Sequence, residues 1–301
     1  MKNTINFYYN IFLDELIKKD NCYYLYYFVP LNRPYDDVQS IYKLNLEMKK
    51  RRCLVHELVL NKDKSIITVV NGISYVLIKL CKYKNDKVFL NDINYIQNMT
   101  ANIECDKSLV RNDWIKLWSE KIDYYEYQIS QVGKKYPLLC DSLSYFIGMG
   151  ENAISYLVNN LDSKTNVNLV VSHKRIYQES GSLNFYDPLN FVVDSRVRDV
   201  AEFIKETFYN KTLNLYDLKS YFNMANLNKN EYILLLGRLL FPTYYFDIYD
   251  DIINKGKSEE LVINIIDRTD EYESLLNTIY KFILYEKKAR LEPIEWLQDK
   301  N

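Results

Sequence analysis

Residues that make sharp turns are scarce in this chain of 301 residues, which has seven glycines and six prolines. Gly72 is the only glycine before Gly133. A glycine-rich loop that cradles phosphate groups through successive backbone N–H groups therefore has no counterpart in the segment that precedes Gly133. This absence argues against an ordinary nucleotide-phosphate loop near the N-terminus.

Zinc-binding patterns and membrane-spanning runs are also missing. No C-x-x-C pair and no cluster of histidines occur, which excludes a structural zinc site. The dispersed thiols fit a reducing compartment, so we expect a cytoplasmic protein without a reactive thiol. No apolar run reaches 18 residues, and the polar N-terminus is no signal peptide. The residues concerned are Cys22, Cys53, Cys81, Cys105, Cys140, His56 and His173.

Positive and negative charges balance in this chain, with 39 Lys and Arg residues against 40 Asp and Glu residues. Because the protein has no strong net electrostatic field, binding to nucleic acid or to an anionic membrane is not expected. Proteins or small molecules are therefore the expected partners. The 29 tyrosines need partners or water for their hydroxyl groups, and we expect most of them at core and boundary positions.

His56, which alternates with apolar residues, is expected to be a structural residue at the surface or boundary.

The first eighty residues predict a small antiparallel α+β unit. The pattern gives a helix in 1–20, a strand at Cys22–Pro30, and a helix capped by Asp36 or Asp37 that runs to about Arg52. Three strands follow, the last two joined by the hairpin signal Asn71-Gly72. Those strands are expected at 54–60, 65–70 and 73–80.

The rest of the chain reads as mostly helical. A short helix is expected at 90–98, and apolar residues then recur at helical spacing in several long segments. A composition shift near 85–112 marks the best domain boundary. The expected helices after it are 113–132, 140–160, 200–209, 215–224, 229–240, 258–266 and 270–288.

One strand pair interrupts the helices. The first strand, from Leu169, ends at His173; the second, Leu183–Tyr186, ends at Asp187; and a helix begins near Val200. Polar residues at the ends of rigid strands are the usual geometry of a site. The alternative is a β-hairpin with polar turn residues, followed by an ordinary helix with an aspartate cap.

These motifs resemble the aminoglycoside phosphotransferase and choline kinase superfamily, and within it the spore-coat-associated kinase-like branch of Firmicutes. Val171-Ser172-His173 resembles its catalytic strand, Asn184-Phe185-Tyr186-Asp187 its metal strand, and the segment 198–204 its buried-Asp helix start. The resemblance implies a two-lobed, protein-kinase-like α+β fold. A small antiparallel-sheet N-lobe would occupy 1–85, and a large mainly helical C-lobe at 86–301 would carry the degenerate strand pair 169–199.

The same resemblance assigns roles to residues. Asp187 would bind the metal, while Asp199, which follows Arg198, would hold the backbone of the His173 loop, a structural task. Arg175 stands where the family has its catalytic base, and a guanidinium cannot accept a proton at neutral pH. The loop lacks the family's metal-binding Asn, and the early strand lacks a lysine that could pair with Glu47.

These absences favour a protein with a degenerate phosphotransfer site, a pseudokinase without a cofactor. Phosphoryl transfer needs charge neutralisation, a metal site and a positioned nucleophile. We therefore expect a non-catalytic binding or scaffold protein with a protein partner. The resemblance to the spore-coat-associated branch implies an association with sporulation or the spore coat.

Two alternatives stay open. An active phosphotransferase would use ATP and Mg²⁺ on a small-molecule substrate, with Asp187 on the metal and His173 or Asp194 as base. Lys174 and Arg175 would then clamp phosphates. An active enzyme predicts two carboxylates at an open cleft, and an inactive one a cleft filled by aromatic residues such as Tyr23, Tyr24, Tyr26 and Tyr27. The second alternative, a helical interaction module, predicts no cleft.

Overall fold

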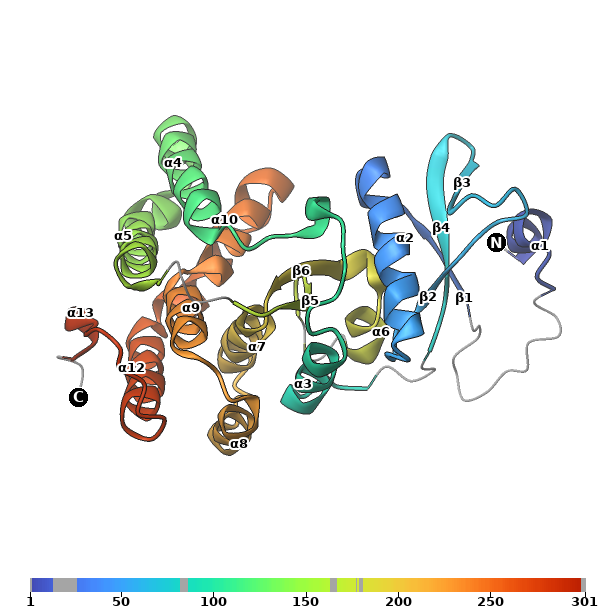
Figure 1. Cartoon of the computed structure of the whole chain (residues 1–301). Helices are drawn as coiled ribbons and strands as arrows, with labels where there is room; N and C mark the ends of the chain where they lie inside the picture. The colour runs from blue at the N-terminus through green and yellow to red at the C-terminus, as the bar shows by residue number, and fades with distance from the viewer. Residues whose placement is uncertain are drawn as a thin grey trace. The chain divides into compact units, whose positions relative to one another are not determined.

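The structure, a computed structural model, describes residues 2–12, 26–81, 86–162, 167–176, 178 and 181–298. Contacts divide the chain into two compact units. The sheet unit comprises residues 1–111 and 168–199, and the helical unit comprises residues 112–167 and 200–301 (Figure 1). The segment 168–199 thus groups with the N-terminal residues, while the lobe boundary at residue 85 stays a prediction.

A four-stranded antiparallel sheet forms the centre of the sheet unit in the described part of the chain. Strand β4 (Ile73–Lys79) pairs along one side with β1 (Tyr26–Pro30). On its other side it pairs first with β3 (Ile67–Val70) and then with β2 (Glu57–Val59). The predicted antiparallel arrangement is confirmed, although residues 22–25 of the first predicted strand lie outside the described residues.

The hairpin between β3 and β4 turns at Asn71-Gly72, as predicted. Both residues have positive φ, 51° and 78°, which is the combination that a two-residue type I′ turn requires. This turn sets the register in which Val70 faces Ile73. The predicted hairpin is therefore confirmed, although its first strand begins at Ile67, two residues later than predicted.

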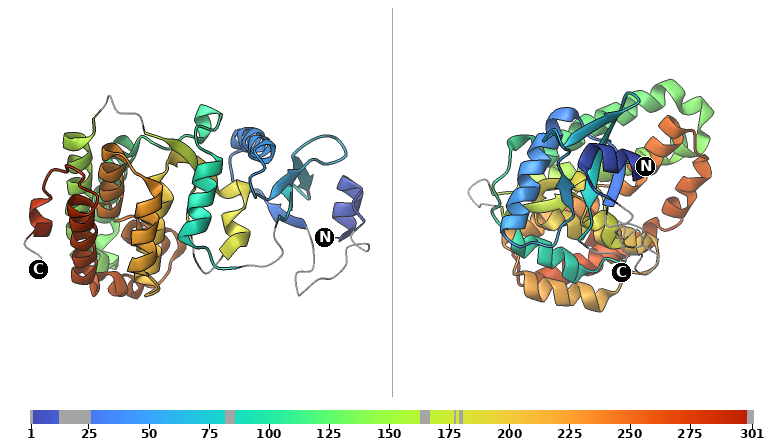
Figure 2. Two further views of the ribbon diagram at one scale, coloured as in Figure 1. Left: turned by 60° about the horizontal axis from the view of Figure 1, so that its bottom comes forward. Right: turned by 90° about the vertical axis from the view of Figure 1, so that its right-hand side faces the viewer.

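Helices pack on the sheet within this unit, as Figures 1 and 2 show for α2. Helix α1 buries Ile5 and Tyr9 against Phe28 and Leu77 of the sheet. Helix α2 follows Pro34 and has no side-chain cap, so the predicted caps Asp36 and Asp37 are wrong; both carboxylates lie in its first turn, where the helix dipole favours them. The helices and the 3-10 turn are α1 (Lys2–Tyr9), α2 (Tyr35–Lys50), α3 (Leu90–Met99) and η2 (Lys107–Leu109).

A second, two-stranded sheet pairs β5 (Leu169–His173) with β6 (Phe191–Ser195). The strand predicted at Leu183–Tyr186 is wrong, because these residues fall in the short helix α6 (Gly181–Phe185) and the turn after it. The 3-10 turn η4 (Pro188–Asn190) then leads into β6. The β-branched residues Val192 and Val193 favour a strand more strongly than Leu183–Tyr186 does, but no strand was predicted there.

The helical unit is a bundle whose long helices lie beside one another, most clearly in Figure 2. Helix α7 (Val197–Tyr209) begins in the sheet unit and continues into this one. The helix α10 was not predicted. The other elements are α4 (Trp114–Val132), η3 (Gly133–Lys135), α5 (Pro137–Asn160), α8 (Leu215–Ala225), α9 (Lys229–Leu240), α10 (Thr243–Lys255), η5 (Glu259–Val262), α11 (Ile263–Ile266), α12 (Thr269–Tyr285) and α13 (Glu295–Gln298).

Stacked aromatic rings fill the core of the helical unit. Tyr125 stacks on Phe246 with centroids 4.5 Å apart, and its hydroxyl donates to Asp250 at 2.9 Å. Tyr272 is fully buried and donates to the carbonyl oxygen of Leu239. These tyrosines serve the core as predicted. Among the described helices, none combines the length and the apolar character needed to cross a membrane.

Candidate functional site

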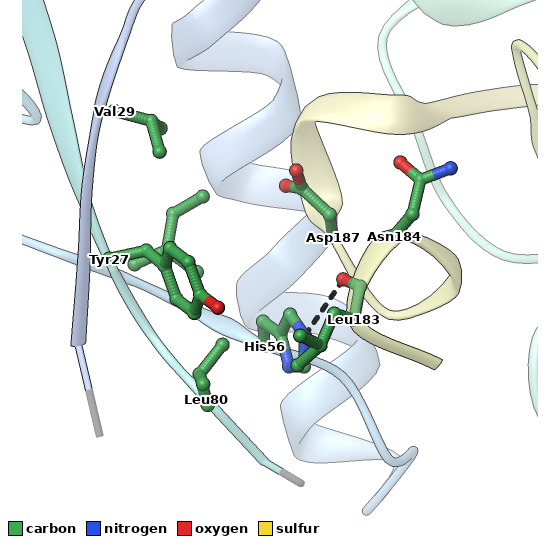
Figure 3. A pocket seen from close by; sticks show the side chains of 8 residues that line it. Tyr27, Val29, His56, Leu80, Leu183, Asn184 and Asp187 are labelled. Atoms are coloured by element: carbon green, nitrogen blue, oxygen red, sulfur yellow. Dashed lines mark hydrogen bonds between the residues drawn. The ribbon is translucent and has the colours of Figure 1, made fainter. Parts of the chain in front are cut away.

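A pocket of about 290 Å³ lies within the sheet unit, between the four-stranded sheet and the α6 segment (Figure 3). Its size is at the lower end of small-molecule sites. The wall is mainly apolar, and Asp187 is the one carboxylate among the described lining residues. Tyr27 is the one tyrosine of the predicted aromatic filling that lines the pocket, and Tyr23 and Tyr24 lie outside the described residues. The lining residues are Tyr27, Val29, His56, Ile78, Leu80, Leu183, Asn184 and Asp187.

His56 lines this pocket and is buried, so the prediction that it lies at the surface or boundary is wrong. Its Nε2 lies 3.0 Å from the carbonyl oxygen of Leu183, which can only accept, so Nε2 carries the hydrogen. Nδ1 then accepts the backbone N–H of Cys81 at 3.1 Å. Burial lowers the pKa of His56 to about 4, which keeps the ring neutral at physiological pH.

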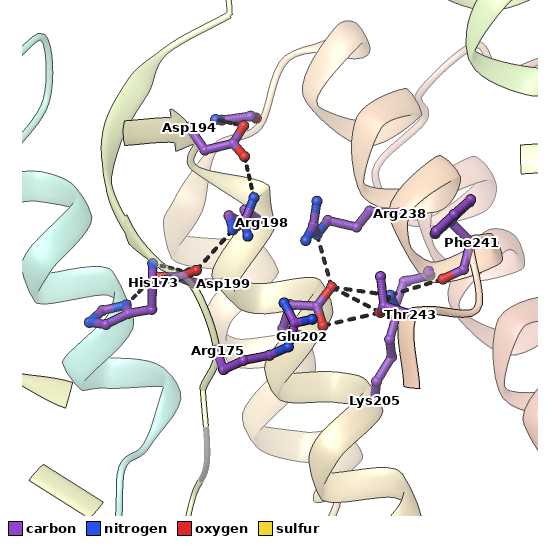
Figure 4. A network of polar contacts seen from close by, with 12 residues as sticks. His173, Arg175, Asp194, Arg198, Asp199, Glu202, Lys205, Arg238, Phe241 and Thr243 are labelled. Atoms are coloured by element: carbon purple, nitrogen blue, oxygen red, sulfur yellow. Dashed lines mark hydrogen bonds and ion pairs between the residues drawn. The ribbon is translucent and has the colours of Figure 1, made fainter. Parts of the chain in front are cut away.

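His173, at the end of β5, is enclosed by hydrogen bonds (Figure 4). Asp199 accepts the backbone N–H of His173 at 2.9 Å and pairs with its Nδ1 at 2.7 Å. The Nε2 lies 2.7 Å from the carbonyl oxygen of Phe185, and Arg198 donates to the carbonyl oxygen of His173. Asp199 thus lies where it holds the backbone of the His173 loop, the position that the resemblance implies.

Side chains far away in sequence hold the whole α6–η4 segment. His56 and His173 each form a hydrogen bond with a carbonyl oxygen of α6. Arg33 donates hydrogen bonds to the carbonyl oxygens of Leu189 and Phe191. The Arg33 guanidinium is buried and also pairs with Asp37 at 3.5 Å. No local pattern in the sequence indicates that Arg33 has a partner 156 residues away.

Asp194 does not line the pocket. It is fully buried on β6, where it pairs with Nη1 of Arg198 at 2.7 Å and accepts the backbone N–H of Ser195. Arg198 therefore links two features, the carboxylate of Asp194 and the backbone of His173. In this arrangement the carboxylate of Asp194 serves the core of the sheet unit.

Lys174 and Arg175 follow His173 and are partly exposed. The side chain of Asn190 brackets the backbone of Arg175, accepting its N–H at 3.4 Å and donating to its carbonyl oxygen at 2.9 Å. The guanidinium of Arg175 turns back to the carbonyl oxygen of Lys174. Burial, and next the charge of Arg33, lower the pKa of Lys174 to about 8, while Asp187 acts in the opposite direction.

Asp187 caps the turn η4 by accepting the backbone N–H of Leu189 at 2.9 Å. Burial raises the pKa of Asp187 to about 6, although that hydrogen bond and Arg33 oppose the shift. In the described part of the chain, no group of three or more His, Cys, Asp or Glu side chains could hold a metal ion. Glu47, on α2, pairs with Lys50 of the same helix and with Arg51, the residue that follows it.

We expect Asp187→Asn to stabilise the protein at neutral pH. The carboxyl has a pKa near 3.8 when unfolded and about 6 when folded, so its stability contribution is present below pH 3.8 and is lost as the pH rises through 6. Because two pKa units correspond to about 3 kcal/mol, the variant should gain up to that amount at pH 7.5 and nothing below pH 3.5. The amide can still cap η4. Urea unfolding at both pH values measures the difference.

The control for this substitution is Asp123→Asn, since Asp123 is exposed on α4. It should leave the free energy of unfolding within about 0.5 kcal/mol at either pH. Equal stability of Asp187→Asn and the parent protein at pH 7.5 would show that the folded protein does not disfavour the Asp187 carboxylate.

Comparisons with known proteins identify the fold and the family. The family described as "Spore coat putative kinase YutH" matches residues 3–279. The "Endospore coat-associated protein YutH" of Bacillus subtilis is 30% identical over 207 residues, which span 61% of this chain and 61% of that protein. The chain thus matches less than two thirds of the length of this relative.

Two solved structures share the fold at 9% sequence identity. An aminoglycoside phosphotransferase from Alicyclobacillus acidocaldarius has a TM-score of 0.58 and covers 86% of each chain. Spectinomycin phosphotransferase APH(9)-Ia, solved with ADP and spectinomycin, has a TM-score of 0.53 and covers 91% of this chain and 84% of its own. The predicted kinase-like α+β fold is confirmed, and the chain belongs to the spore coat YutH family of kinase-like proteins.

Proposed function

We propose that this chain is a kinase-like protein that transfers no phosphate and serves as a binding or scaffold component of the spore coat assembly. The observation that carries the proposal is Arg175, two residues after His173. In the family that the sequence resembles, this position holds the catalytic base. A guanidinium remains protonated at neutral pH and cannot take a proton from a hydroxyl group.

The position of Arg175 is fixed, which supports this proposal. Asn190 bonds both the backbone N–H and the carbonyl oxygen of Arg175, and β5 precedes it. Asp194, the alternative base, is fully buried in its pair with Arg198. His173 has an acceptor at each ring nitrogen, so its ring is occupied as well. Among the described residues, these candidates supply no base to the pocket.

The residues of the pocket fit a catalytic Mg²⁺–ATP complex poorly. Kinase-type transfer uses an Asp and an Asn that hold metal ions, together with a lysine for the phosphates. Asp187 and Asn184 both line the pocket, but their polar ends point in different directions in Figure 3. The Asp187 carboxyl, with its pKa raised to about 6, also caps η4. We therefore propose no reaction at this site that uses a metal ion or a nucleotide.

Association with the spore coat is the second part of the proposal. The family description and the B. subtilis relative both name the spore coat. A protein partner fits a chain whose positive and negative charges balance. Most of the hydrogen-bonded α6–η4 segment is buried, but Leu183, Asn184 and Asp187 are partly exposed and line the pocket, where a partner could reach them.

The test combines a binding and a transfer measurement on the purified chain. We expect no Mg²⁺-dependent transfer of the γ-phosphate from ATP to water, small alcohols or amines, in the parent protein or in Asp187→Ala. In a spore-forming host that lacks the protein, the Asp187→Ala chain should restore coat assembly as well as the parent chain does. Transfer activity that Asp187→Ala abolishes would overturn the proposal.

An active phosphotransferase is the second candidate, and one observation favours it. Asp187 lines the pocket, and the charges of Arg33 and Lys174 act on its carboxyl. Thermal stability with millimolar ATP and Mg²⁺ separates the two candidates at the binding step. A ligand at about 100 times its Kd adds roughly 2.7 kcal/mol to the folded state. A Mg²⁺-dependent shift that Asp187→Ala removes would favour this candidate.

A further inference from the structure

A second pocket, of about 340 Å³, lies wholly within the helical unit. Its wall comes from the middle of α5, from α12 and from the C-terminal helix α13, so none of its lining belongs to the sheet unit. Glu273 is the one charged residue among the described lining residues. A pocket whose only charge is a carboxylate favours a positively charged ligand.

The carboxylate of Glu273 is held in place at this wall. It is 4% exposed, and its Oε1 accepts the hydroxyl of Tyr145 at 2.5 Å. Burial, and then Glu273 and Asp270, raise the pKa of Tyr145, so two carboxylates disfavour further negative charge at that hydroxyl. The same electrostatic field attracts a cation.

Aromatic and polar groups complete the wall. Tyr145 and Trp296 both line the pocket, and the face of an aromatic ring attracts a cation. Met149 adds a polarisable thioether, and the Asn152 amide offers a carbonyl oxygen as an acceptor for N–H donors. This set of an acidic group, aromatic rings and an acceptor matches an alkyl chain that ends in a charged N–H₃ group.

We propose that this pocket binds an aliphatic ammonium group, carried by a small amine or by a lysine side chain of a partner protein. The alkyl chain lies against Met149 and Trp296, and the ammonium group pairs with Glu273. This site is separate from the proposed function, and it does not require phosphate transfer or a nucleotide.

Gly148 provides a way to close the pocket. It lines the pocket on α5, and a Cβ atom built there meets nothing within 4 Å. A Cβ atom therefore fits there without moving its neighbours, and we expect a longer side chain to extend into the space of the ligand. Since leucine also has a higher helix propensity than glycine, Gly148→Leu should fold at least as well as the parent protein.

The experiment compares n-butylammonium with n-butanol, which has the same chain length and no charge, by NMR titration of the whole chain. We expect butylammonium to bind about tenfold more tightly. Glu273→Gln should abolish this preference, and Gly148→Leu should abolish binding of both probes. Glu271→Gln, an exposed carboxylate on the same helix, should change neither. Because Glu273 is buried and its variant can lose stability, Gly148→Leu is the independent check.

Equal affinities for the two probes, binding that persists in Gly148→Leu, or no binding of butylammonium would each overturn the proposal. The source of the ammonium group is examined with 1,4-diaminobutane and with a blocked lysine, Nα-acetyl-lysine amide. Tighter binding of the diamine indicates a small amine, and tighter binding of the blocked lysine indicates a partner protein.

Discussion

Glu202→Gln is expected to lower the free energy of unfolding by about 3–5 kcal/mol, because it removes the negative charge between two buried cations. Glu202 accepts Nε of Arg238 at 2.9 Å and Nζ of Lys205 at 3.2 Å (Figure 4). Lys205 also donates to Thr243 and to the carbonyl oxygen of Phe241. Lys205 and Arg238 are 2% and 3% exposed, so water cannot replace the carboxylate.

Two further variants make this prediction specific. Glu271→Gln removes an exposed carboxylate that pairs with Arg268, and it should cost less than about 1 kcal/mol. Glu202→Gln combined with Lys205→Met removes one of the two buried cations and should recover part of the loss. Urea unfolding measures all three. A loss below 1 kcal/mol in Glu202→Gln would mean that the protein interior tolerates the two cations without the charge of Glu202.

Asp199→Ala is expected to cost about 3–5 kcal/mol, since it deprives two buried groups of His173 of their acceptor. These groups are the backbone N–H, 2.9 Å from Oδ1, and the ring nitrogen Nδ1, 2.7 Å from Oδ2. The loss should appear in urea unfolding. It should also increase hydrogen exchange at the His173 amide more than at the amides of β4.

The isosteric variant Asp199→Asn should cost only about 1 kcal/mol. Its Oδ1 can still accept the backbone N–H of His173, and its Nδ2 can donate to Nδ1 while Nε2 keeps its hydrogen for the Phe185 carbonyl. An Asn variant as unstable as the Ala variant would indicate that the negative charge of Asp199, and not its hydrogen bonds, holds the loop.

The parts of the fold that depend on local sequence were predictable. A two-residue type I′ turn requires positive φ at both central residues, and Asn-Gly is a pair that adopts it readily. Asn71-Gly72 therefore predicted the hairpin. The apolar run that ends at His173 likewise predicted β5. The amphipathic spacing of 270–288 predicted α12, which ends three residues earlier, at Tyr285.

The α6 segment shows why the rest could not be predicted. Leu183-Asn184-Phe185-Tyr186 is too short for helical and strand periodicity to be told apart. What determines its backbone comes from elsewhere: His56 is 127 residues from its acceptor Leu183, and Arg33 is 156 residues from Leu189. A single sequence carries no signal of such pairs. The sequence therefore predicted which residues belong to the candidate site, but not how they are arranged in space.

The two histidines of the chain have a spectroscopic consequence. Each Nε2 faces a carbonyl oxygen of α6, that of Leu183 for His56 and that of Phe185 for His173, so each carries a hydrogen. Both rings are 1% exposed, and hydrogens on buried imidazole nitrogens exchange slowly with solvent. A one-dimensional proton spectrum should therefore contain a downfield Nε2–H resonance from each histidine, one that reports on the middle of α6 at Leu183 and one that reports on its last residue, Phe185. Their separate disappearance on warming would report, without any label, whether the middle or the C-terminal end of this helix detaches first.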